Sequence, residues 1–186
     1  MRKEFKNADG KIEYCDEIVE SMWDYIEIRQ GSLWGVVDED YKEILPCIYE
    51  EVVVFPQGRM GAKQKEKWGL FDAKGEQIIP CEYDDVNGEF YGDYVCVELG
   101  GKKGLVHEDG EMVLPCKYDY IEIQPDEYIV VCLGGKWGIV NEEGDEVVPC
   151  IYDHVEVEEH AEEGYATFVL DGRICRRYDN GEVYWD

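Results

Sequence analysis

Apolar and polar residues alternate in short runs along this chain, and the runs are bounded by glycine, proline, aspartate or asparagine. In the run at residues 68–72, alternation places Trp68 and Leu70 on one face and Gly69 and Phe71 on the other. This period of two predicts a β-strand. No segment has a helical period over a length that would favour a stable helix, so the pattern predicts an all-β fold.

The residues that follow this run predict a hairpin. Asp72–Gly75 has the sequence of a type I turn followed by a left-handed glycine, and Asn141–Gly144 has it again. Residues 77–80 form the expected return strand, which Pro80 should end or leave with an unpaired edge. A further strand is expected at 94–98, so each unit should contain three to four short strands.

The hairpin is repeated along the chain. Its Trp-Gly glycine recurs at positions 35, 69, 104 and 138, and proline, cysteine and tyrosine follow it at constant spacings. Columns that keep one register indicate a tandem repeat of about 34 residues, whose units bury apolar faces against their neighbours. A divergent N-terminal cap, four repeats and a C-terminal capping hairpin are expected to form one domain. Their boundaries are 1–32, then 33–66, 67–101, 102–135 and 136–170 within a repeat region of 33–172, then 171–186.

Both ends of the chain depart from the repeat. Residues 5–14 contain an Asp-Gly hairpin signal, although residues 12–24 could instead form a short helix. A fifth unit should start at Gly172, 34 residues after Gly138, and close as a hairpin at Asn180–Gly181. The basic cluster in this region is expected to pair with acidic residues of the fourth repeat. It consists of Arg173, Arg176 and Arg177.

Two repeats depart from the pattern internally. The third has Lys103 in place of the tryptophan, which should loosen that packing layer or leave a local opening. The first has Tyr41 in place of the turn glycine, so its turn is expected to differ.

The repeats could be arranged in two ways. A rolled or superhelical array of β-hairpins is the favoured arrangement. The alternative is a small closed β-propeller in which the terminal segments share a blade. A repeat of 34 residues is short beside the roughly 40–45 residues of the best-known propeller repeats, so the array ranks first.

The chain is strongly acidic. Eighteen lysines and arginines stand against 44 aspartates and glutamates, which gives a formal net charge of −26. Nucleic acid and anionic membranes attract positive surfaces, so both are poor partners. Residues 137–172 contain no lysine or arginine, and this stretch predicts a surface for a basic protein, although acidity could also serve solubility alone. The candidate partner-binding residues are Glu142, Glu143, Asp145, Glu146, Glu156, Glu158, Glu159, Glu162 and Glu163.

Eight cysteines occur, and four of them fill the position after the repeat proline. A cysteine that recurs once per unit behaves as a small buried hydrophobe, so reduced structural thiols are expected rather than disulfides. No Cys-x-x-Cys pair is present, which leaves a zinc knuckle or a thioredoxin-type site without support.

No residue pattern points to catalysis. The histidines occupy three different repeat positions, and His107 stands at a turn position where exposure is expected. Cys150 and His154 make a weak nucleophile pair, because that cysteine recurs in repeats without a histidine. A metal site at His160 among glutamates has little support, and neither a calcium loop nor a phosphate-binding loop fits. The chain is therefore expected to be no enzyme and to need no cofactor or metal.

The repeat motif resembles that of a known family. It reads K-W-G, two apolar residues, D-x-x-G-x, two further apolar residues and P-x-x-Y-D, and it is similar to the WG-repeat family of mostly bacterial β-repeat proteins. The resemblance covers residues 33–172 and is most specific in the second and fourth repeats. It implies an all-β repeat that serves as a binding or scaffold module without catalytic residues.

Two functions follow as hypotheses. The first is a non-enzymatic protein-binding or scaffold module with a basic partner, in one version an immunity or inhibitor protein that covers the basic site of a nuclease-like toxin. The second is binding of a glycan or another small ring on aromatic platforms such as Trp34, Trp68 and Trp137, which could instead form the core. No secretory signal is visible at the start, so a cytoplasmic location is expected. The oligomeric state is left open.

Overall fold

The computed structural model describes residues 3–20, 24–55, 58–124, 129–160, 165–178 and 182–186. These residues form β-strands joined by turns, and none of them belongs to a helix that could span a membrane. The predicted all-β class is confirmed. The strands are β1 (Lys3–Lys6), β2 (Ile12–Cys15), β3 (Glu17–Glu20), β4 (Tyr25–Gln30), β5 (Leu33–Asp38), β6 (Glu43–Tyr49), β7 (Glu51–Val54), β8 (Met60–Gln64), β9 (Lys67–Phe71), β10 (Gln77–Tyr83), β11 (Asp85–Tyr91), β12 (Tyr94–Leu99), β13 (Lys102–His107), β14 (Met112–Tyr118), β15 (Tyr120–Ile123), β16 (Ile129–Leu133), β17 (Lys136–Val140), β18 (Glu146–Tyr152), β19 (Val155–His160), β20 (Tyr165–Leu170), β21 (Arg173–Tyr178) and β22 (Val183–Trp185).

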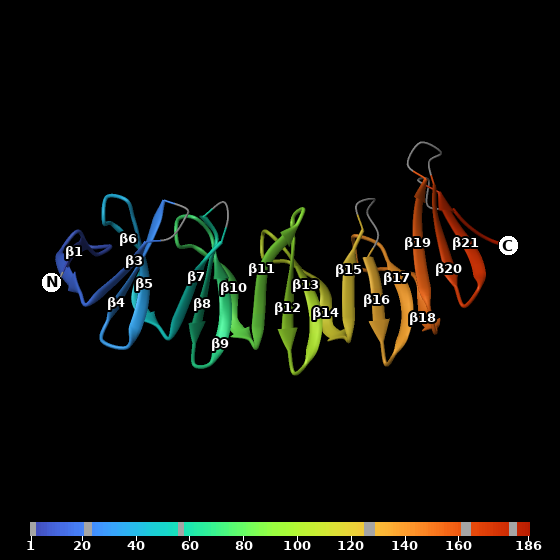
Figure 1. The fold of residues 1–186 in the computed structure, drawn as a ribbon, viewed down its shortest axis with the longest axis horizontal. Helices are drawn as coiled ribbons and strands as arrows, with labels where there is room; N and C mark the ends of the chain where they lie inside the picture. Colours follow the sequence, from blue (N-terminus) through green and yellow to red (C-terminus); the bar gives the residue numbers. More distant parts are fainter. Residues whose placement is uncertain (1–2, 21–23, 56–57, 125–128, 161–164, 179–181) are drawn as a thin grey trace. The chain divides into compact units, whose positions relative to one another are not determined.

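Consecutive strands form tandem four-stranded antiparallel sheets (Figure 1). The sheets are β3–β6, β7–β10, β11–β14, β15–β18 and β19–β22, and β1 pairs with β2 in a separate hairpin. Each sheet takes its first two strands from the end of one sequence repeat and its last two from the start of the next. Within the described part of the chain the two terminal segments share no sheet, which contradicts the shared blade of the propeller alternative.

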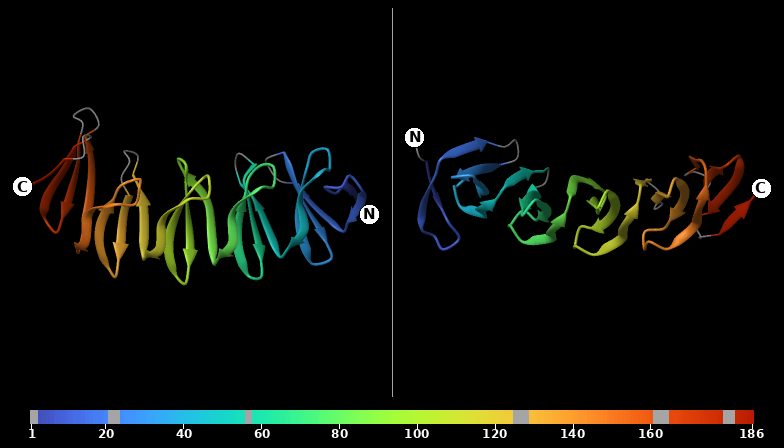
Figure 2. Two further views of the ribbon diagram at one scale, coloured as in Figure 1. Left: turned by 180° about the vertical axis from the view of Figure 1, so that it is seen from behind. Right: turned by 90° about the horizontal axis from the view of Figure 1, so that it is seen from below.

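The chain divides into two compact units, and the first comprises residues 1–112. In this unit the sheets β3–β6 and β7–β10 pack face to face, as the views in Figure 2 show. Val36 and Leu45 of one sheet contact a buried cluster that contains Met60 and Phe71 of the other. Sheets that pack in this way bury apolar side chains on their facing sides, which is the main stabilising contribution expected for such a repeat.

The second unit comprises residues 113–186 and repeats this packing between β15–β18 and β19–β22. Ile139 and Val148 lie against Phe168 and Cys175, and each of these side chains is at most 1% exposed.

The third strand of a sheet is covered on both faces. Leu70 and Phe71 are neighbours in β9 and therefore point to opposite faces, yet they are only 0% and 4% exposed. Val36 and Val37 of β5 are both fully buried. The predicted alternation is confirmed, and both of its faces are apolar because a structural neighbour lies on each side.

The repeat proline lies inside the return strand. In β9–β10, Trp68 pairs with Tyr83 and Leu70 pairs with Ile79, so Gly69 alone faces residues 80–82. The same register shift occurs in β5–β6 and in β17–β18. A β-bulge accommodates the proline, so the expectation that proline ends the strand is wrong. The alternative expectation of an unpaired edge is confirmed, because β10 is an edge strand of its sheet.

The Trp-Gly glycine is needed because this bulge comes too close for a side chain. A Cβ on Gly69 would lie 2.7 Å from the carbonyl oxygen of Ile79 and 2.8 Å from Sγ of Cys81. The equivalent glycines of β5 and β17 would meet a carbonyl oxygen at 2.5 and 2.6 Å. The space above Gly69 is filled by the Cys81 thiol, which donates to the carbonyl oxygen of Ala62 at 3.5 Å.

The turn between the third and fourth strands carries a glycine that packs on the preceding sheet. Gly75 has a φ of +82°, and its N–H donates to the carbonyl oxygen of Asp72 at 3.0 Å, which confirms the predicted turn. A Cβ on Gly75 would lie 2.2 Å from the carbonyl oxygen of Ile44 in β6. Glycine is therefore required both for the positive φ and for the close approach. The equivalent approaches are Gly110 to Ile78 at 2.6 Å and Gly144 to Val113 at 2.5 Å.

The N-terminal cap is a hairpin followed by the first two strands of the first sheet. β1 pairs with β2, and Gly10 in their turn has a φ of +76°, which confirms the Asp-Gly hairpin. The alternative helix over 12–24 is wrong for residues 12–20, which form β2 and β3, while 21–23 lie outside the described part. Strand geometry prevails because Cys15 can then join Phe5 in the buried cluster against the first sheet.

The first turn keeps the geometry of the glycine turns. Tyr41 adopts a φ of +58°, and its N–H donates to the carbonyl oxygen of Asp38 at 2.9 Å. The expectation of a different turn is therefore wrong. The neighbour at this position is β1, whose Lys6 N–H donates to the carbonyl oxygen of Tyr41 at 2.7 Å. A side chain is tolerated there at a backbone cost of about 1–2 kcal/mol.

The last sheet replaces the Trp-Gly pair by Ile174 and Cys175. Gly138 and Cys175 are each the third residue of the third strand of their sheet, whereas Gly172 lies in the preceding turn with a φ of +78°. The expectation that the fifth unit starts at Gly172 is therefore wrong by three residues. β21 and β22 pair without a register shift. The predicted turn at Asn180–Gly181 lies outside the described residues.

The arginines of the last sheet contact its own C-terminal strand and the residue that follows it. Arg176 forms an ion pair with Asp186 at 2.5 Å, and the guanidinium of Arg173 lies 4.9 Å from the ring centroid of Trp185. These partners belong to the C-terminal segment, and the expected pairing of the arginines with the fourth repeat stays a prediction.

Candidate functional site

Four of the predicted partner-binding residues lie together in the turn after β17 and at the first residue of β18. They are Glu142, which is half-buried, and Glu143, Asp145 and Glu146, which are exposed. Asn141 closes this turn: its Oδ1 accepts the N–H of Asp145 at 2.7 Å, and its carbonyl oxygen accepts the N–H of Gly144 at 3.0 Å. The four carboxylates are therefore carried on a backbone that the turn holds in one conformation. We call residues 141–146 the acidic turn.

The remaining predicted residues do not form one surface with these four. Glu156, Glu158 and Glu159 belong to β19, which pairs with β20 along its whole length. Glu162 and Glu163 lie outside the described residues. The structure thus brings the first four residues together and places the backbone of Glu156, Glu158 and Glu159 on a separate strand.

The acidic turn differs in charge from the turns of the first two repeats. The turns at 38–42 and 72–76 contain a lysine each, at Lys42 and Lys74. In the third repeat, Glu108 forms an ion pair with Arg59. The acidic turn contains no cationic residue.

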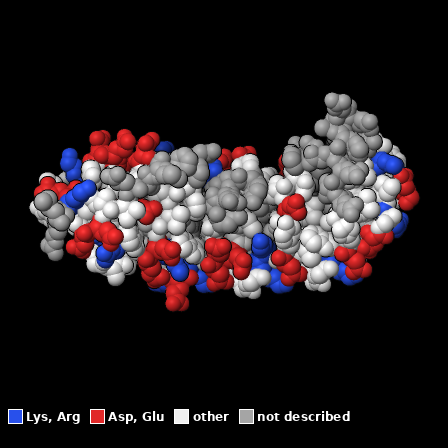
Figure 3. Space-filling model, viewed as in Figure 1, with Lys and Arg blue, Asp and Glu red and all other residues white. Residues whose placement is uncertain are grey.

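Carboxylates gather at the ends of the strands on the face shown in Figure 3. The cause lies in the packing of the sheets. Apolar side chains fill both faces of the third strands β5 and β9, so the turns that follow these strands are places where charged side chains reach solvent.

Some acidic residues close hairpins and are not free to meet a partner. Asp84, between β10 and β11, accepts the N–H of Gly100 at 2.7 Å and forms an ion pair with Lys67. The hydrogen bond from Lys67, and after it that from Gly100, lowers the pKa of Asp84. Sequence reasoning missed this role, because the residue and the turn it closes are separated by 16 positions. The equivalent pairs are Asp16 with Gly31 at 2.9 Å and Asp119 with Gly134 at 2.6 Å.

The tryptophans proposed as ligand platforms are half-buried and have protein partners on their rings. Arg29 lies over Trp34 and Lys63 over Trp68, each 5.7 Å from the ring centroid. The third ring, in β17, has Tyr120 edge-on at 5.5 Å. These contacts reduce the ring area that a ligand could use. Lys103, at the tryptophan position of the third repeat, is half-buried opposite Glu98, and the predicted loosening of that layer stays a prediction.

The cysteines pack as small buried groups. All eight are unbridged, three are buried and five are half-buried. Burial, with the nearby charge of Glu43, raises the pKa of Cys47 to about 12. Burial also raises the pKa of Cys81 and of Cys150, the latter with the charge of Glu146. Thiols of this kind are poor nucleophiles at neutral pH, which agrees with a packing role.

No group of three or more His, Cys, Asp or Glu side chains in the described part of the chain could hold a metal ion. His154 is exposed, and only the backbone of His160 is described. His107 is half-buried rather than exposed, with Nδ1 2.9 Å from Oδ1 of Asp109.

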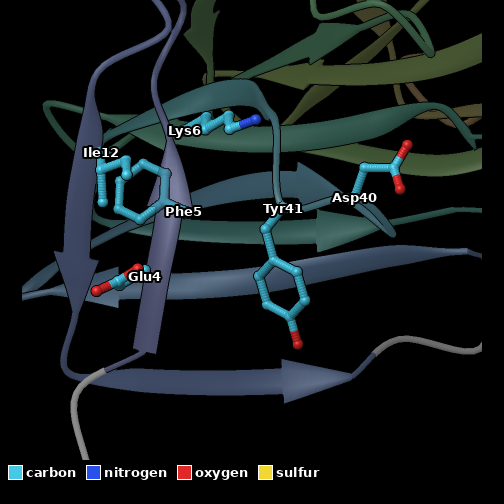
Figure 4. Close-up of a pocket in the computed structure, with 6 residues that line it drawn as sticks. All are labelled: Glu4, Phe5, Lys6, Ile12, Asp40 and Tyr41. Carbon is cyan, nitrogen blue, oxygen red and sulfur yellow. The ribbon is translucent and has the colours of Figure 1, made fainter.

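A pocket of about 180 Å³ lies beside the N-terminal hairpin (Figure 4). Figure 4 shows Phe5 and Ile12 beside each other on the two strands of the hairpin. The pocket is smaller than the roughly 300–1,000 Å³ of typical ligand sites, and no predicted site residue lies in it. Its lining residues are Glu4, Phe5, Lys6, Ile12, Asp40 and Tyr41.

Several solved structures are similar to this chain in fold at low identity. Hsv2 of Kluyveromyces lactis is 12% identical with a TM-score of 0.38, over 97% of this chain and 60% of that one. A eukaryotic initiation factor is 7% identical with a TM-score of 0.42, over 92% of this chain and 55% of that one. PorZ of Porphyromonas gingivalis is 10% identical with a TM-score of 0.37, over 96% of this chain and 28% of that one. The chain spans less than two thirds of each, and no function transfers at this level of likeness.

Curated proteins and protein families give different results. No curated protein matches the chain. The family model described as "WG containing repeat" matches four tandem segments, at residues 34–68, 68–102, 104–137 and 137–173. These segments make up more than half of the chain. The chain therefore belongs to the WG-repeat family, as its repeat motif indicated.

Proposed function

We propose that this WG-repeat protein is a non-enzymatic binding or scaffold module that receives a basic protein partner on its acidic turn. One observation carries the proposal: three exposed carboxylates, those of Glu143, Asp145 and Glu146, lie within residues 141–146, without a cationic residue among them, on a backbone closed by Asn141. The partner follows from complementarity, because a net charge of −26 repels acidic macromolecules and attracts basic ones.

Two physical arguments support a turn as the contact point. The chain's negative charge steers a basic protein over about 8 Å, the Debye length at physiological salt. A turn that is already ordered by its own hydrogen bonds loses little conformational entropy on binding, so more of the contact energy remains as affinity.

A narrower version of the proposal is an immunity or inhibitor protein. In this version the acidic turn covers the basic site of a nuclease-like toxin in the cytoplasm, and the protein needs no cofactor. Its support is the acidic charge and the small size of a chain of 186 residues. Charge complementarity of this kind raises association rates and excludes acidic competitors.

The test is a matched pair of charge-neutralised proteins. The first carries Glu143→Gln, Asp145→Asn and Glu146→Gln, which leave Asn141 and Gly144 to close the turn. The control carries Glu4→Gln, Glu82→Gln and Asp85→Asn, which remove the same charge from exposed positions elsewhere. Circular dichroism should show that both variants retain the fold.

Immobilised wild type and variants would capture proteins for identification by mass spectrometry, and titration calorimetry would measure the affinity of the captured partner. We expect the captured partner to be a basic protein. Its affinity for the first variant should be at least tenfold lower than for the wild type, and its affinity for the control should be unchanged. Binding to the wild type should weaken at higher salt. Equal retention by both variants would exclude the acidic turn. Equal loss by both would show that net charge alone attracts the partner.

Binding of a glycan or a small ring is the second candidate and has less support. The half-buried rings of Trp34 and Trp68 keep some exposed surface, but a cationic side chain of the protein already lies over each ring. A sugar that quenched or shifted their fluorescence would favour this candidate over the first.

A further inference from the structure

The turn of the third repeat, residues 107–111, is closed differently from its counterparts. In the second repeat, Oδ1 of Asp72 accepts the N–H of Lys74 at 2.9 Å and of Glu76 at 2.8 Å. In the first repeat Oδ1 of Asp38 accepts the two equivalent N–H groups at 3.0 and 2.9 Å. The third repeat has a histidine at this position.

Asp109 accepts one of the two backbone hydrogen bonds that the first residue of the turn accepts in the first two repeats. The N–H of Glu111 donates to Oδ1 of Asp109 at 2.9 Å, where the other turns use the carboxylate of their first residue. Oδ1 of Asp109 in turn lies 2.9 Å from Nδ1 of His107. The imidazole thus orients the carboxylate that closes the turn.

Nδ1 of His107 has two neighbours that require opposite protonation states. A bond to Oδ1 of Asp109 requires a proton on Nδ1. The backbone N–H of Asp109 lies 3.4 Å from the same nitrogen, and that bond requires its lone pair. One nitrogen cannot donate and accept at once, so the presence or absence of a proton on Nδ1 itself decides which group of Asp109 is held.

The groups around His107 favour the protonated form. The hydrogen bond to Asp109 raises the pKa of His107, and the charges of Asp109, Asp93 and Glu108 add to it, while partial burial opposes them. The ring of Tyr94 meets the imidazole edge-on at 5.6 Å. Glu108, the next residue in the chain, forms an ion pair with Arg59.

We propose that the turn at 107–111 is a pH-sensitive switch, in which doubly protonated His107 holds the Asp109 carboxylate and loss of the Nδ1 proton, which leaves the neutral Nε2–H tautomer, releases it. The released state lets Nδ1 accept the Asp109 N–H, as the aspartates of the first two turns accept theirs. It also removes one positive charge from a turn that contains three carboxylates, those of Glu108, Asp109 and Glu111. The switch goes beyond the proposed function and requires no partner.

The direction follows from the pKa shifts. The folded-state pKa of His107 is raised above its ordinary value of about 6.5. The stability from its bond to Asp109 is therefore fully present below about pH 6.5 and is lost as the pH rises through the folded pKa. The pKa of Asp109 is lowered by the N–H of Glu111 and by His107, so its carboxylate stays ionised at mildly acidic pH. The state in which His107 holds the Asp109 carboxylate should therefore predominate at mildly acidic pH.

Nuclear magnetic resonance of the full chain tests this inference. We expect the backbone amide signals of Asp109 and Glu111 to shift with pH at the same midpoint as the imidazole of His107, above about pH 6.5. The amide of Glu76, which the Asp72 carboxylate holds in the second repeat, is the internal control and should not shift at that midpoint. Static amide signals at Asp109 and Glu111 during the His107 titration would overturn the proposal.

Two variants make the test specific. Asp109→Asn should return the His107 midpoint towards about 6.5, because the carboxylate that favours the imidazolium is gone. His107→Asn places at this turn the residue that closes the acidic turn, so it should fold, and the Glu111 amide should stop titrating near neutral pH. An unchanged His107 midpoint in Asp109→Asn, or an unchanged Glu111 titration in His107→Asn, would also contradict the switch.

Discussion

The sheets β7–β10 and β19–β22 have the same four-stranded order but different third strands. In the first, Gly69 faces a proline bulge with a register shift. In the second, Cys175 occupies the third position of β21, and β21 and β22 pair in continuous register. The comparison shows that the Trp-Gly glycine and the Pro-Cys bulge occur together, because the sheet that lacks the glycine also lacks the bulge.

The two sheets also differ in how their central hairpins are closed. In the first, Glu50 precedes β7 and its carboxylate accepts the N–H groups of Lys65 at 2.9 Å and Glu66 at 3.0 Å from the hairpin. At the last sheet the direction is reversed: Asp171 in the hairpin accepts the N–H groups of Asp153 at 2.7 Å and His154 at 2.9 Å. The carboxylate can therefore move to the other side of the contact while the backbone arrangement is kept.

Filling the glycine position should produce the largest effect. Gly69→Val puts a side chain where a Cβ alone would lie 2.7 Å from a carbonyl oxygen, and we expect a loss of about 3 kcal/mol in the free energy of unfolding. Cys175→Val in the last sheet meets no bulge and should cost less than about 1.5 kcal/mol. Urea unfolding of both variants measures the difference. Equal losses would break the link between glycine and bulge.

Disrupting the contact between the turn and the preceding sheet should have the next largest effect on stability. Gly144 and Gly135 both have positive φ, at +82° and +76°, but only a Cβ on Gly144 would meet the preceding sheet, at 2.5 Å from Val113. Gly135→Ala should cost about 1 kcal/mol for its backbone conformation. Gly144→Ala should cost about 1–2 kcal/mol more, because the turn must move away from the preceding sheet to make room for the added Cβ. Thermal unfolding measures the stability of the two variants. Equal stabilities would show that the close approach of Gly144 to the preceding sheet contributes nothing.

The hairpin closure by Asp84 should appear as a pH effect. Its pKa is lowered, so its contribution to stability is present above its ordinary pKa of about 3.9 and is lost as the pH falls through the folded value. Asp84→Asn should flatten the stability profile in that acidic range, and Lys67→Met, which removes one of its two partners, should give an intermediate profile. Denaturant midpoints between pH 2 and 6 test this. Identical slopes in wild type and Asp84→Asn would contradict the closure.

Thiol reactivity should give the smallest effect. With a pKa of about 12, Cys47 should be a thiolate to only about one part in 10⁴ at pH 8, against roughly a quarter for an ordinary cysteine. Iodoacetamide labelling mapped by peptide mass spectrometry should find it slow in the folded protein and fast in urea. Rapid labelling of Cys47 in the folded state would show that the bulge opens readily.

Local sequence was sufficient for the fold class and the repeat. Alternation in residues 68–71 and the turn at Asp72–Gly75 depend on neighbours in the chain, so their strand and hairpin could be predicted. The repeat motif was sufficient for the family. The acidic turn could also be predicted as a group, because its four carboxylates lie within a few residues of one another.

Tertiary structure decided what depends on a neighbouring strand or sheet. Pro80 stays inside its strand because Gly69, eleven positions earlier in the chain, leaves room for a bulge. Tyr41 can replace a glycine because β1, rather than another sheet, contacts its turn. Asp84 closes a hairpin 16 positions away. Such contacts join residues that are distant in sequence, so their geometry is set only when the sheets pack.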